Sequence, residues 1–256
     1  MATVAVPADL ALADKRWTMW HTAGVTALIP ATGAAGALIP WAAGASAGWA
    51  RLVAWLAILA LLTALTMVIG HGVTAQAIRG VFIDDRNRVS TARVQVGIWG
   101  AIVLSGYLAA VLANAALHLA DPLLVTVPQT LWAAMGVSTT SFVASPFMLH
   151  QRKKQGGKMA KNPEPTNARW RDMVTGEEES TTNSVDIAKL QMVLVTIILV
   201  LAYGIALGYA LYTEHGKITT LPKVNDAFAI LLAISHGGYL ARKAAPKGGD
   251  VAPKKA

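Results

Sequence analysis

Three small groups of polar residues stand within long apolar stretches, and the first is a row of serines. Ser138, Ser141 and Ser145 follow one another at intervals of three and four, so in a helix they share one face. Such a face could line a polar path, but more often small polar residues allow close helix packing and bond back to a carbonyl of the preceding turn. Ser138 or Ser141 with His236 would make a hydrolase pair, although nothing in the sequence orients the base.

Two histidines form the second group. His236 lies well inside an apolar stretch, and ionisable residues within membrane helices are candidates for function. His71, between Gly70 and Gly72, is expected toward the same side of the membrane. The pair could ligate haem or a metal ion, but histidines on two helices are common, so this is the weaker interpretation. The chain has no cysteine, which excludes thiolate metal sites and cysteine nucleophiles.

The third group occurs twice, each time at the start of an apolar stretch. Arg93 precedes Gln95 by two residues, and Lys189 precedes Gln191 in the same way. A cation near a helix N-terminus could bind an anionic ligand or a lipid headgroup. The alternative is structural: the glutamines bond between helices, and the long cationic side chains extend to the lipid phosphates.

The composition indicates where these residues lie. Of 256 residues, 54% are hydrophobic and 14% are charged, and the mean hydropathy is +0.47. Soluble domains carry about 25% charged residues, so a water-facing surface cannot cover this chain. In lipid, backbone groups must be satisfied within helices or a closed barrel, and the apolar runs here are long rather than alternating. We therefore predict an all-α integral membrane bundle.

Six stretches approach the roughly 20 residues that a helix needs to cross a bilayer. They are 20–41, 49–69, 94–117, 124–149, 190–212 and 224–240. With the N-terminus in the cytoplasm, inner segments hold 19 of the 22 lysines and arginines, and outer segments hold only Arg51, Lys217 and Lys223. This asymmetry predicts both termini inside. It also explains the net charge of +8 by attraction to anionic inner-leaflet lipid rather than to nucleic acid. It is left open whether 20–41 crosses fully and whether 124–149 and 224–240 re-enter.

The chain also resembles itself at a shift of 96 residues. Residues from Asn87 match those from Asn183, and further along Pro128 pairs with Pro222 and Ser138 with Ser235. Each unit starts inside, so we expect two parallel two-span repeats related by an axis along the membrane normal. The predicted division is a cytoplasmic N-terminus (1–19), an N-terminal membrane pair (20–72), repeat 1 (84–150), a cytoplasmic linker (151–182), repeat 2 (183–243) and a disordered basic tail (244–256).

Three strings, IDDRNRVSTARVQ, VPQTLWAAMGVSTTSFVASP and LAISHGGYLARKAAP, resemble a group of bacterial multi-pass inner-membrane proteins. The likeness covers roughly 80–246 and includes a D-R-N-R-x-S-x-x-R-x-Q motif. It implies a bacterial inner membrane and supplies no activity.

The leading functional expectation is a non-enzymatic scaffold, accessory or self-assembling subunit of a membrane complex, because the spans are rich in small residues and carry no mid-span Asp, Glu, Lys or Arg. One alternative is a passive channel or carrier along the repeat interface, gated near Gln95 and Gln191. Another is a haem-binding redox subunit. The expected partners are the bilayer, its anionic inner-leaflet lipids, and other membrane subunits or further copies of the chain.

Overall fold

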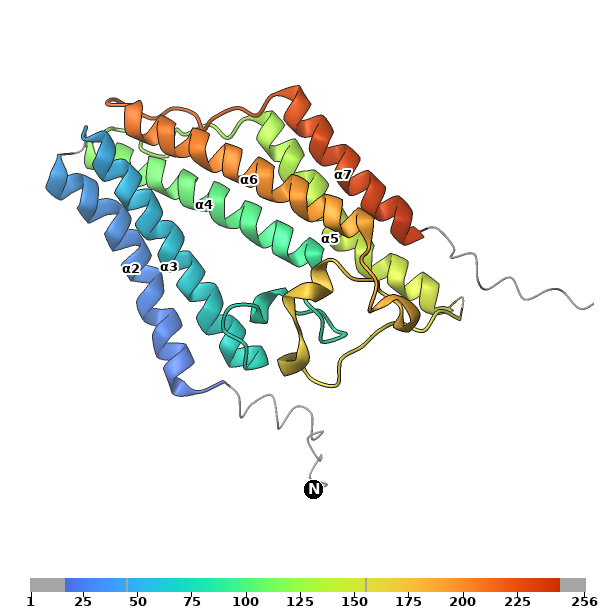
Figure 1. Ribbon diagram of the computed structural model, residues 1–256. Helices are drawn as coiled ribbons and strands as arrows, with labels where there is room; N and C mark the ends of the chain where they lie inside the picture. Colours follow the sequence, from blue (N-terminus) through green and yellow to red (C-terminus); the bar gives the residue numbers. More distant parts are fainter. Residues whose placement is uncertain (1–16, 45, 155, 245–256) are drawn as a thin grey trace, which may run out of the picture.

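The computed structural model describes residues 17–44, 46–154 and 156–244, and these form a bundle of long helices (Figure 1). The helices are α2 (Met19–Ala43), α3 (Gly48–Thr74), α4 (Thr91–Ala116), α5 (Gln129–Lys154), α6 (Ile187–Thr213) and α7 (Asp226–Ala244). The short 3₁₀ turns are η1 (Gly80–Phe82), η2 (Pro165–Asn167), η3 (Trp170–Met173) and η4 (Glu179–Thr181). Within those ranges there are isolated bridges but no strands, so the predicted all-α class is confirmed. The predicted segments 1–19 and 244–256 lie almost wholly outside the described residues.

Four helices, α2, α3, α4 and α6, are long and apolar enough to span a membrane. α2 continues through Pro30 and Pro40, which membrane helices tolerate. α5 and α7 occupy the positions of the predicted fourth and sixth spans but are less apolar. Serines and threonines interrupt α5, and both helices end in basic residues. The structure therefore supports a membrane protein with four plainly apolar spans.

α2 and α3 form a hairpin beside α4, and α4 to α7 lie side by side (Figure 1). The connections 117–128 and 214–225 meet at one end of the bundle, where the Thr126 amide donates to the Thr219 carbonyl over 2.7 Å. At the other end, residues 75–90 and 156–186 pack together, and we call them the cap. There the Asn162 amide donates to the Arg86 carbonyl over 2.9 Å. The predicted linker thus follows a defined path.

Close helix contacts and buried polar bonds hold the bundle interior together. Trp55 Nε1 on α3 donates to Ser105 Oγ on α4 over 3.0 Å. Gly48 begins α3 against the end of α6, where a Cβ atom would lie 1.7 Å from the Tyr212 carbonyl oxygen, so only glycine permits this approach. Arg51 is buried at the same end and donates to the Gly216 carbonyl over 3.0 Å. α3 is therefore fixed to α4 and to the connection that follows α6.

The two similar sequence segments begin their helices at matching positions. α4 starts at Thr91 and α6 at Ile187, which are 96 residues apart, as in the sequence match. Ser90 and Asp186 occupy the two N-cap positions. The Asp186 carboxylate accepts from the Ala188 amide over 3.1 Å, whereas the Ser90 side chain makes no cap bond.

Candidate functional site

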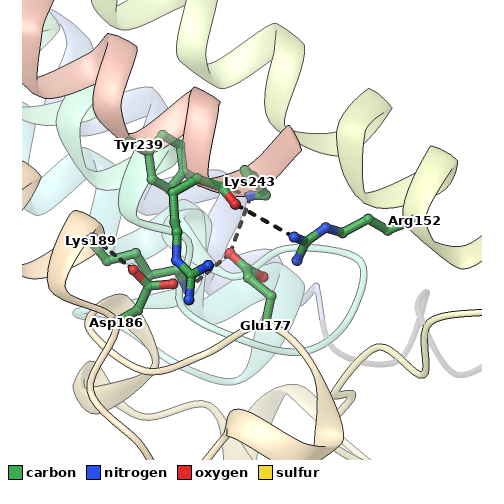
Figure 2. Close-up of a pocket in the computed structure, with 7 residues that line it drawn as sticks. Arg152, Glu177, Asp186, Lys189, Tyr239 and Lys243 are labelled. Carbon is green, nitrogen blue, oxygen red and sulfur yellow. Dashed lines mark hydrogen bonds and ion pairs between the residues drawn. The ribbon is translucent and has the colours of Figure 1, made fainter. Parts of the chain in front are cut away.

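A buried carboxylate stands at the centre of the cap. Glu177 is only 7% exposed and forms ion pairs with Arg86, with Lys189 over 2.9 Å and with Lys243 over 3.2 Å. The three cations come from separate elements: the connection before α4, the first turn of α6 and the last turn of α7. Figure 2 shows Glu177 between these ends of α6 and α7. One side chain therefore joins three parts of the fold that are distant in sequence.

Further bonds around Glu177 satisfy the cations. Lys189 Nζ also donates to the Thr175 carbonyl over 2.9 Å, and Arg86 pairs with Asp84 over 2.7 Å. Arg88 is buried beside them, where it donates to the Gly176 carbonyl over 2.8 Å. Buried charges require this kind of pairing, because an unpaired ion loses its hydration without compensation.

These neighbours determine the protonation state of Glu177. Burial alone would raise the pKa of its carboxyl group, because the charged form loses water. Lys189, Lys243 and Arg86 outweigh this effect and hold the pKa well below its ordinary value of 4.5. Glu177 is therefore an ionised carboxylate at neutral pH.

A row of polar side chains leads from Glu177 into the bundle along the contact between α5 and α7. Lys243 Nζ donates to Ser145 Oγ and to the Tyr239 hydroxyl, and Ser145 and Tyr239 lie 3.1 Å apart. One turn further in, Ser141 Oγ is 2.6 Å from His236 Nδ1. The three predicted serines do share one buried face, which is turned toward α7. We call Ser138, Ser141, Ser145, Ser235, His236, Tyr239 and Lys243 the polar row.

The geometry does not assemble a catalytic centre from Ser141 and His236. Ser141 is fully buried, and among the described residues the other ring nitrogen of His236 has no partner to orient it. The space beside Glu177, enclosed by Lys189, Tyr239, Lys243 and their neighbours, measures only about 10 Å³. That volume is at the lower limit for one water molecule.

The repeated pair of predicted ligand residues occupies different environments in the two segments. Gln95 is buried and bonds to Thr196 on α6, which agrees with the alternative that the glutamines bond between helices. Gln191, in contrast, is exposed. Lys189 joins the Glu177 cluster, whereas Arg93 donates to the Ile83 carbonyl over 2.7 Å. The two copies of this predicted pair therefore have different surroundings.

The two candidate haem or metal histidines have different partners. His71 Nδ1 lies 2.9 Å from His21 Nε2, and the two rings stack between α3 and α2. His236 bonds instead to Ser141 on α5. The part of the chain that the structure describes contains no cluster of three or more His, Asp or Glu side chains suited to a metal ion.

Sequence reasoning missed the central residue of the site. Glu177 stood out only as the first of three consecutive acidic residues in a segment rich in lysine and arginine. In the sequence, Lys243 is one of several cationic residues after the last apolar stretch, and nothing there distinguishes it from the others. The chain matches no protein-family model, no curated protein and no solved structure, so the site is interpreted from its geometry alone.

We predict that Glu177→Gln opens the cap. The substitution leaves Lys189 and Lys243 buried without their counter-ion, which costs about 3–5 kcal/mol. In detergent, trypsin should cleave the exposed sites Lys161 and Arg169 on the order of a hundredfold faster than in the wild type. Glu179→Gln is the matched control, since that side chain is exposed two residues away, and it should leave cleavage unchanged. Equal cleavage of both variants would contradict the central role of Glu177.

The pH dependence of stability in the wild type and in Glu177→Gln tests whether Glu177 is ionised. Because the folded-state pKa lies below 4.5, the unfolded state binds more protons in this range, and the stabilisation disappears as the pH falls. The difference in melting temperature between the wild type and Glu177→Gln should stay constant from pH 7 to about 5 and shrink below about 4.5. A difference that already shrinks between pH 7 and 5.5 would show a raised pKa instead.

Proposed function

We propose that this chain is a non-enzymatic subunit of a bacterial inner-membrane complex, in which it acts as a scaffold and receives a transmembrane helix of a partner or of a second copy. The observation that carries the proposal is a groove of about 740 Å³ between α3 and α4. Helices within a bilayer have no hydrophobic driving force to associate, because lipid tails are as apolar as their side chains. They associate instead by close packing against small residues. This groove offers such a surface.

Small side chains contribute to both walls of the groove, beside larger apolar ones. α4 contributes Gly97, Gly100 and Ala101, in which Gly97 and Ala101 have the small-xxx-small spacing that lets backbones approach closely. α3 contributes Thr63 and Thr66, and both are exposed and bond to carbonyls of their own helix. Their polar atoms therefore need no partner across the groove.

At Gly100 the chain itself leaves the groove unfilled, whereas the Phe82 ring packs against Gly97. A Cβ atom added at Gly100 would meet nothing within 4 Å. Arg93, Phe82 and Trp170 line the same groove near the cap, so it combines an apolar surface with a cation at one end. Such an end suits the lipid headgroup region, where aromatic and cationic residues gather.

Filling the groove tests this proposal. We predict that Gly100→Leu preserves the folded monomer, because there is free space at that position, and removes at least about nine-tenths of the associated form. The assay is purification from native membranes in mild detergent, followed by mass measurement of the intact assembly. Gly136→Leu, at an exposed position of α5 with nothing within 4 Å, is the matched control. A wild-type monomer that carries only lipid would contradict the proposal.

We further propose six crossings with both termini in the cytoplasm, built from two parallel repeats. Three observations support this arrangement. α4 and α6 start 96 residues apart, Val89 and Val185 each form a bridge just before these helices, and Thr126 and Thr220 bridge in parallel at the opposite end. α5 has 26 residues and α7 has 19, or about 39 and 28 Å of helix, which is close to the hydrocarbon thickness.

Single cysteines test the crossings directly, because the chain has none of its own. We predict that an impermeant maleimide labels Asp121→Cys and Lys223→Cys on intact cells, and labels Glu164→Cys and Arg242→Cys only after the membrane is opened. All four positions are exposed, so accessibility within the fold does not limit the reaction. Labelling of Asp121→Cys and Glu164→Cys from the same side would show that α5 does not cross, and the same result for Lys223→Cys and Arg242→Cys would show it for α7.

A further inference from the structure

At the inner end of the polar row, away from the cap, some polar atoms have no hydrogen-bond partner among the described residues. α5 and α7 run in the same direction toward the cap, and each residue of the row is at most 5% exposed (Figure 1). At the cap end, Lys243 uses its three protons on Glu177, Ser145 and Tyr239, so this end is complete. The inner end contains Ser138, Ser235 and the free side of His236.

Three atoms at this inner end are buried without a partner among the described residues: Ser138 Oγ, Ser235 Oγ and His236 Nε2. The three residues lie within about one helical turn of the Ser141–His236 contact, because Ser138 is three residues before Ser141 and Ser235 adjoins His236. Orphaned buried polar atoms are rare, and several of them together usually indicate bound water.

The chemistry of the imidazole strengthens this argument. If Ser141 donates to Nδ1, the Nε2 atom carries a proton with no acceptor. If Nδ1 donates to Ser141, Nε2 is a lone pair with no donor. In either tautomer the Nε2 atom of His236 requires a further partner. If the hydroxyl of Ser138 or Ser235 were that partner, the hydroxyl would still need a second hydrogen bond of its own. Water is the ligand that can both donate and accept at all three atoms.

We propose that α5 and α7 hold water molecules at His236, and that the polar row connects this water to the cytoplasmic side through the cap. The row is closed on the side away from the cap. Beyond Ser138 and Ser235, further from the cap, the contact becomes apolar: Leu131, Ala134 and Leu232 are each at most 1% exposed and pack in the hydrophobic core. The chain therefore carries a hydrated half-path that can bring protons to His236 and stops there.

The proposal is independent of the α3–α4 groove, since the polar row lies between α5 and α7. The test uses the full chain in lipid bilayers with ¹⁵N-labelled histidine and measures magnetisation transfer from water to the His236 ring by solid-state NMR. His236→Gln assigns the signal among the six histidines. We expect transfer to His236, which is only 2% exposed, to be as fast as transfer to the exposed His118 and His150.

Two variants separate bound water from mere proximity to the cap. Ser138→Ala with Ser235→Ala removes two partners of the water and should slow the transfer to His236 at least fivefold. Thr139→Ala with Thr140→Ala removes two hydroxyls from the same helix that are exposed and bond only to their own backbone, so it should change nothing. The absence of transfer to His236 in the wild type, or equal transfer in both double variants, would overturn the proposal.

Discussion

The charge of Glu177 is the constraint on which the cap end of the molecule depends. A buried carboxylate is tolerated only with counter-ions at contact distance, and here the connection before α4, the start of α6 and the end of α7 each supply one. Movement of α6 or α7 away from the cap would separate Lys189 or Lys243 from the buried carboxylate that compensates it. The gain is therefore in uniqueness of geometry more than in net stability, because ion pairs of this kind seldom exceed well-packed apolar residues in energy.

This constraint also sets the register of α5 and α7. Lys243 is held by Glu177, and the same ammonium group bonds to Ser145 and Tyr239. Once this turn is fixed, helical periodicity places Ser141 opposite His236 one turn deeper. Direct bonds thus join the cap to the contact between α5 and α7. They do so although the segment that carries Glu177 has no regular secondary structure beyond single turns.

The distribution of side chains differs from that of a soluble protein. Large apolar side chains of α2, α3 and α6 are exposed, whereas serines, a histidine and a lysine are buried between helices. In lipid this distribution is favourable, because the hydrocarbon accepts the outer surface and the interior satisfies the polar groups. Two features depart from this pattern: buried polar atoms that lack partners among the described residues, and an outer groove that side chains leave partly unfilled.

The sequence by itself determined the helical membrane class, because long apolar runs with so little charge have no other stable arrangement in water or lipid. It also identified the shared face of the three serines, since this follows from spacing along one helix. Only the tertiary structure decided that Gln95 is buried while Gln191 is exposed, and that Lys189 and Lys243 meet at Glu177. Periodicity fixes which residues share a face of one helix. Which face meets another helix, and which distant charge enters the gap, depends on contacts between residues many tens of positions apart, which no local pattern encodes.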